Sequence, residues 1–175
     1  MKRFAKTLHV FAILPFLAAP AMAAGDGGGS SDKTPTCETG KVWDKDKNKC
    51  VPKTSALDDE SIYEYGRDLA YAGRYDEAID VLTLAHDKTD ARILNFLGYA
   101  HRKSGRIEVG LGYYQEAIRN DPNYTLVREY LGEAYLQLGD IASARGQLTE
   151  IKNRCGVECR EYSLLARQID VFVQG

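Results

Sequence analysis

Three glycines recur at nearly equal spacing in the C-terminal two thirds of the chain, and this recurrence constrains the fold most. They are Gly66, Gly98 and Gly132, and the first interval is only two positions shorter than the second. Seven residues after each stands another glycine, and five residues later a second small residue follows: Gly73, Gly105 and Gly139, then Ala78, Gly110 and Ala144. A unit this small cannot bury its apolar face alone, so the units must stack on one another.

The pattern inside each unit predicts two helices. From Leu57 onward apolar residues recur at intervals of three and four, and Pro122, the only proline in this stretch, falls between two expected helices. The first glycine of a unit would let its two helices approach closely. The second would end the first helix, where the chain needs a left-handed turn.

The repeated motif resembles the tetratricopeptide repeat family. The family pattern is a bulky residue, Leu-Gly, a Tyr, a small residue, a bulky residue and a Pro, with a period of about 34 residues. The second unit reads Leu94, Leu97-Gly98, His101, Gly110, Tyr114 and Pro122. The resemblance implies an all-α fold, a right-handed α-solenoid of three helix pairs plus a C-terminal capping helix. It divides residues 57–175 into repeats at about 59–90, 91–124 and 125–158 and a cap at 159–173.

Three departures from the pattern give further expectations. The first repeat is two residues short near 86–90, which predicts a tighter exit turn. Arg128 stands where the family has an apolar residue, which predicts more open packing. The expected cap places four large residues on one stripe: Tyr162, Leu165, Ile169 and Phe172.

The N-terminus has the pattern of a secretory signal peptide at 1–23. A basic head containing Lys2 and Arg3 precedes the apolar run Leu8–Ala19, and Ala21-Met22-Ala23 fits a cleavage site. The alternative, a membrane anchor, is disfavoured because the run is short and interrupted by proline. We therefore expect a periplasmic or secreted protein without an integral membrane segment after cleavage. Residues 24–36 are Gly- and Ser-rich, which is typical of a flexible linker.

Four cysteines in an oxidising compartment predict two disulfides. Their order favours Cys37 with Cys50, closing a loop at 37–56, and Cys155 with Cys159, stapling the cap, although three connectivities are possible. A redox pair at the second site is the alternative, but such pairs more often have two intervening residues. We expect no zinc there. We also expect no calcium at 44–55, because Lys49 stands where a calcium loop needs glycine.

Charge and motifs argue against two classes of function. After cleavage at residue 23 the chain has 20 Lys and Arg against 25 Asp and Glu, so the mature protein is acidic. An acidic surface disfavours general binding to nucleic acid. No nucleophile–base motif, zinc-protease motif or phosphate loop occurs. We therefore expect no enzyme and no cofactor.

The resemblance implies that the first helices line a concave groove that binds a protein or an extended peptide. Tyrosine and arginine often carry interface energy. The candidate groove residues are Tyr63, Arg67, Tyr71, Asn95, Tyr99, Arg102, Lys103, Glu129 and Glu133. The family's carboxylate clamp is not expected, because Tyr63 and Arg67 stand at two of its Lys and Asn positions. The alternative function is a glycan or small-molecule binder that uses Trp43. The oligomeric state stays open.

Overall fold

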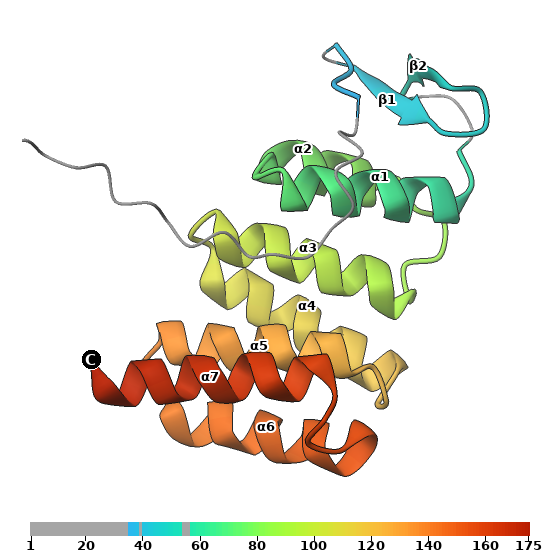
Figure 1. The fold of residues 1–175 in the computed structure, drawn as a ribbon. Helices are drawn as coiled ribbons and strands as arrows, with labels where there is room; N and C mark the ends of the chain where they lie inside the picture. The colour runs from blue at the N-terminus through green and yellow to red at the C-terminus, as the bar shows by residue number, and fades with distance from the viewer. Residues whose placement is uncertain (1–34, 39, 54–56) are drawn as a thin grey trace, which may run out of the picture. The chain divides into compact units, whose positions relative to one another are not determined.

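A computed structural model describes residues 35–38, 40–53 and 57–175 (Figure 1). The predicted signal peptide and the linker up to residue 34 lie outside these residues. The elements are β1 (Lys41–Asp44), β2 (Lys49–Pro52), α1 (Asp59–Tyr71), α2 (Tyr75–Leu82), α3 (Ala91–Lys103), α4 (Ile107–Asn120), α5 (Thr125–Gln137), α6 (Ile141–Cys155) and α7 (Arg160–Gln174). No helix in the described part is long and apolar enough to cross a membrane.

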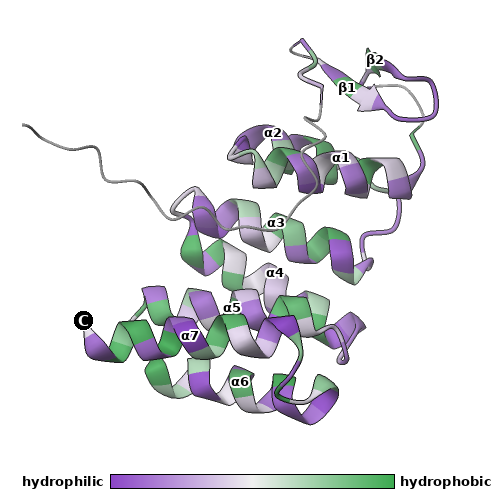
Figure 2. Cartoon of the chain, viewed as in Figure 1, coloured by the Kyte–Doolittle hydropathy of each residue, from purple (hydrophilic) through white to green (hydrophobic). Residues whose placement is uncertain are grey.

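The helices form the stacked pairs that the glycine spacing predicts. Helices α1, α3 and α5 each have 13 residues, and Gly66, Gly98 and Gly132 each occupy the eighth position. Every helix packs against the next in the chain. Figure 2 shows hydrophobic and hydrophilic residues mixed along the helices, and every helix has both buried hydrophobic residues and exposed residues. The all-α solenoid fold is thus confirmed.

The turn glycines adopt the conformation that the sequence predicts. Gly73, Gly105 and Gly139 follow α1, α3 and α5 with φ values of +77°, +87° and +77°. Residues with a Cβ are strained in this left-handed region, so glycine is the residue that ends each first helix.

The first small residue of each repeat marks a close approach, but not always to the same helix. A Cβ on Gly66 would lie 2.4 Å from Leu82 of α2, and a Cβ on Gly98 would lie 2.6 Å from Tyr114 of α4. At Gly132 the nearest atoms instead belong to Leu165 of α7, at 2.5 Å. The third glycine therefore makes room for the last helix rather than for α6.

Helix α7 takes the place of the first helix of a fourth repeat. Leu165-Ala166 stands one full repeat length after Leu131-Gly132, and α7 packs on α5 and α6 as α3 packs on α1 and α2. Leu165 and Ile169 are buried, as the capping stripe predicted. Phe172 is 44% exposed, contrary to that prediction, because it lies in the final turn of α7.

The first repeat, which is two residues short, has a shortened second helix and not the tighter exit turn that the sequence predicts. Helix α2 has 8 residues, whereas α4 and α6 have 14 and 15. The segment that replaces the missing turns is held by Asp59, whose carboxylate accepts hydrogen bonds at 2.7 Å from the backbone N–H groups of His86 and Asp87.

We expect Asp59→Ala to lower the free energy of unfolding by about 2 kcal/mol, because two backbone donors lose a charged acceptor. These hydrogen bonds hold the pKa of Asp59 below its ordinary value. The stabilisation is therefore complete above the unfolded-state pKa and is lost as pH falls through the lowered folded-state pKa. Urea denaturation at neutral and acidic pH measures it. If the native protein and Asp59→Ala differ by the same free energy of unfolding at neutral and at acidic pH, the stabilisation does not come from the ionised carboxylate of Asp59.

Arg128 is buried, so the expectation of open packing at this position is wrong. Its side chain donates a hydrogen bond of 2.9 Å to the Pro122 carbonyl and lies 3.8 Å from Glu150. Arg154 donates to the same carbonyl at 2.6 Å. Burial and the neighbouring Arg154 lower the pKa of Arg128. A long side chain with polar partners thus fills the space of the family's apolar residue.

The N-terminal hairpin packs on the first repeat. Strands β1 and β2 are antiparallel, with Val42 opposite Val51, and the Cys37–Cys50 disulfide is present. Both valines are buried in the hydrophobic core that also contains Ile62 and Tyr65 of α1. Trp43 is half-buried and packs on this core, so its ring has a structural role.

Candidate partner-binding surface

The nine candidate groove residues lie on α1, α3 and α5, and we call the surface that they line the first-helix face. The structure divides them by exposure. Tyr71 and Lys103 are exposed; Tyr63, Arg67 and Glu133 are half-buried; Asn95, Tyr99, Arg102 and Glu129 are buried. Sequence position identifies the face but not which of its side chains reach solvent.

Aromatic rings from all three repeats gather on this face, and we call them the aromatic cluster: Tyr63, Tyr71, Phe96, Tyr99 and Tyr130. Phe96 contacts every other member, with ring-centroid distances from 5.3 to 6.5 Å. Tyr99 and Tyr130 lie 5.0 Å apart. Tilted and edge-on contacts at such distances stabilise aromatic groups beyond simple burial.

A hydrogen bond across the cluster joins the first repeat to the third. The hydroxyl groups of Tyr71 and Tyr130 lie 3.1 Å apart, and either can be the donor. Burial raises the pKa of both hydroxyls, so both are neutral near neutral pH. Tyr71 thereby reaches from α1 across α3 to α5.

A buried ion pair lies beside the aromatic cluster. Arg102 of α3 and Glu133 of α5 are separated by 2.5 Å, and their side chains are 1% and 11% exposed. Arg102 also donates to the hydroxyl of Tyr114 at 3.2 Å, and Gln168 of α7 donates to Glu133 at 2.6 Å. Burial raises the pKa of Tyr114 to about 12. Because the charge of Arg102 is already paired, an acidic partner would have to displace Glu133.

The other cations of the face differ in their pairing. Arg67 pairs with Asp68 at 2.8 Å. Lys103 is exposed, and its ammonium lies 5.5 Å from the ring centroid of Tyr99. Lys103 and Tyr71 are therefore the two candidate residues that present the most surface to a partner.

Asn95 is a buried polar residue of the first-helix face whose side chain lacks hydrogen-bond partners in the described part of the chain. Its side chain is fully buried, and neither its amide nitrogen nor its carbonyl oxygen has a hydrogen-bond partner among the described residues. Leaving such groups unpaired costs about 1–3 kcal/mol. Sequence analysis placed Asn95 on the face but gave no sign of this burial.

The sequence profile described as "Tetratricopeptide repeat" matches residues 63–125 and 97–152, which together span more than half of the chain. The chain belongs to the tetratricopeptide repeat family. No curated protein sequence matches it.

Solved structures of tetratricopeptide repeat proteins share this fold. The Yersinia enterocolitica type III secretion chaperone SycD, in complex with a peptide of the translocator YopD, has a TM-score of 0.54 and 20% identity over 66% of this chain and 88% of its own. PcrH in complex with the chaperone-binding region of PopB has a TM-score of 0.54 and 25% sequence identity, over 65% of this chain and 93% of its own. The first tetratricopeptide repeat domain of RPAP3, bound to an HSP90 peptide, has a TM-score of 0.58 and 19% sequence identity, over 69% of this chain and 97% of its own.

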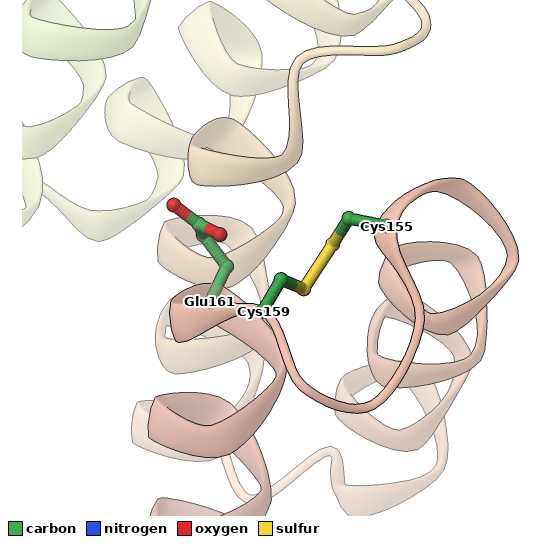
Figure 3. A group of neighbouring side chains, drawn as sticks. All are labelled: Cys155, Cys159 and Glu161. Carbon is green, nitrogen blue, oxygen red and sulfur yellow. A yellow bond between two sulfur atoms is a disulfide. The ribbon is translucent and has the colours of Figure 1, made fainter.

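In this tetratricopeptide repeat protein a second disulfide lies where the last repeat meets α7. It joins Cys155, the last residue of α6, to Cys159, which precedes α7 (Figure 3). Glu161 lies nearby, and its carboxylate and the two sulfurs fall within 4.8 Å of one another. Because both sulfurs are bonded to each other, they are not metal ligands in this state. The arrangement fits a staple between α6 and α7.

Proposed function

We propose that this chain is an exported scaffold that binds an extended polypeptide segment along its first-helix face. The carrying observation is the aromatic cluster, which brings rings from three repeats together and leaves Tyr71 47% exposed. The exposed Lys103 lies against Tyr99, another ring of this cluster. Large rings with polar tips supply binding energy at little entropic cost. SycD, PcrH and RPAP3 were each solved with a segment of another protein.

Export is part of the proposal. Two disulfides, one in the hairpin and one at α7, suit an oxidising compartment. The signal pattern at 1–23 supplies the route, and the partner would then be an envelope or extracellular protein.

A photo-crosslinking amino acid placed at two exposed positions tests the proposal. Lys103 lies on the first-helix face, whereas Glu108 lies on α4 and outside that face. We expect crosslinking in intact cells to give a defined adduct from position 103 and at least about 5-fold less from position 108, as expected when interface energy is concentrated in few residues. Mass spectrometry identifies the adduct and shows whether the chain is cleaved after Ala23.

Equal yields from the two positions, or adducts from position 108 alone, would refute binding on the first-helix face. A chain that keeps the segment 1–23 would refute export by cleavage. Tyr99 and Arg102 are unsuitable positions for this test. Both are buried, so replacing either one would destabilise the fold as well as change the first-helix face.

A further inference from the structure

We propose that Tyr71 is a gate on the first-helix face, closed over the aromatic cluster in this structure and swung into solvent when a polypeptide segment binds. The inference rests on the proposed function, because it describes how the same face admits its partner. It is carried by the position, the exposure and the contacts of Tyr71.

Tyr71 is placed where a side chain can turn without unpacking a helix. It is the last residue of α1, two residues before the left-handed Gly73. Tyr71 is 47% exposed, whereas Phe96, Tyr99 and Tyr130 are 1%, 5% and 7% exposed. Among these four rings, therefore, Tyr71 is the one that can move while the other three stay buried beneath it.

Few contacts hold Tyr71 closed. Its ring meets Phe96 edge-on at 5.3 Å and Tyr99 at 5.8 Å, and its hydroxyl meets that of Tyr130 at 3.1 Å. These contacts place Tyr71 over two buried rings and link α1 to α5. Swinging it out would break one hydrogen bond and two ring contacts, and would leave the helix backbone unchanged.

Opening would uncover groups that an extended polypeptide can satisfy. Phe96 and Tyr99 would offer ring surface to an apolar or aromatic side chain, and the hydroxyl of Tyr130 would need a new partner. Asn95 lies one helical turn before Tyr99 on the same side of α3, and its amide is unpaired. Main-chain N–H and C=O groups of a bound segment are the complementary donors and acceptors.

Fluorine NMR on protein containing 3-fluorotyrosine tests the gate without any ligand. Because an exposed side chain rotates rapidly, we expect the Tyr130 signal of the native protein to be a population-weighted average of the closed and open environments. Tyr71→Phe keeps the ring but removes the hydroxyl, so the open population should rise about 2- to 10-fold, the effect of losing one hydrogen bond. Val109→Ala, at an equally exposed residue of α4, should leave the signal unchanged.

A Tyr130 signal that has the same temperature dependence in the native protein and in Tyr71→Phe, apart from a small constant local shift, would overturn the gate. Crosslinking from position 103 separates this failure from a failure of the proposed function. With a gate, Tyr71→Phe increases the yield of the adduct. An adduct whose yield is the same in both proteins refutes the gate while partner binding stands. Loss of every adduct, while the Tyr130 signal still responds to Tyr71→Phe, refutes partner binding alone.

Discussion

Gly110→Ala should lower the free energy of unfolding by about 3 kcal/mol, although alanine is the better helix former. A Cβ on Gly110 would lie 2.8 Å from the carbonyl oxygen of Gly98 and 3.2 Å from the backbone nitrogen of Arg102. These are backbone atoms of α3, so no side chain can turn away to make room. The added methyl group must push α4 away from α3.

The same helix supplies the matched control. Gly112 is also in α4, and a Cβ there would meet nothing within 4 Å. Gly112→Ala should therefore raise the free energy of unfolding by about 0.5–1 kcal/mol through helix propensity alone. Urea denaturation followed by far-ultraviolet circular dichroism compares the two variants. If both gained stability, the close crossing of α3 and α4 would be wrong.

The crossing at Gly110 also positions the first-helix face. Gly98 and Gly110 face each other where α3 meets α4, and Arg102 lies one turn further along α3. Displacement of α4 would carry Tyr114 with it, and so disturb the hydrogen bond that its hydroxyl accepts from Arg102. Crosslinking from Lys103 in Gly110→Ala should therefore fall together with stability.

The register of the repeats and the turns between their helices could be predicted from the sequence, because both depend on where glycine occurs. Gly66, Gly98 and Gly132 fix the register, and the left-handed glycines after each first helix fix the turns. Both requirements are local. The sequence predicted α7 as a capping helix, and its likeness to the first helix of a repeat was hidden because Ala166 replaces the motif glycine.

The candidate site was predictable as a face but not as a set of contacts. Arg102 meets Glu133, and Tyr71 meets Tyr130, although the members of each pair lie in different repeats. Such pairs depend on how successive repeats stack in space. The spacing of residues along the sequence does not predict which side chains of two different repeats will meet. The same limitation explains Arg128, whose partner is the backbone carbonyl of Pro122.

Glu133→Ala should be as damaging as any single change on the face, at about 3–5 kcal/mol, because it leaves the guanidinium of Arg102 buried and unpaired. Arg102→Met should cost somewhat less, since Glu133 is 11% exposed and keeps the hydrogen bond from Gln168. The double variant Arg102→Met with Glu133→Ala removes both charges, so its cost should be well below the sum of the two single costs.

A double-mutant cycle measures this difference, and an exposed pair supplies its control. Arg92 and Glu60 also join neighbouring repeats, at 2.8 Å, but their side chains are 41% and 54% exposed. We expect a coupling energy of at least about 2 kcal/mol for Arg102 and Glu133, and below about 0.5 kcal/mol for the exposed pair. Added salt should abolish only the exposed coupling, because buried charges are poorly screened. Equal couplings would mean that water reaches Arg102, and the first-helix face would then be open at its centre rather than closed by its own side chains.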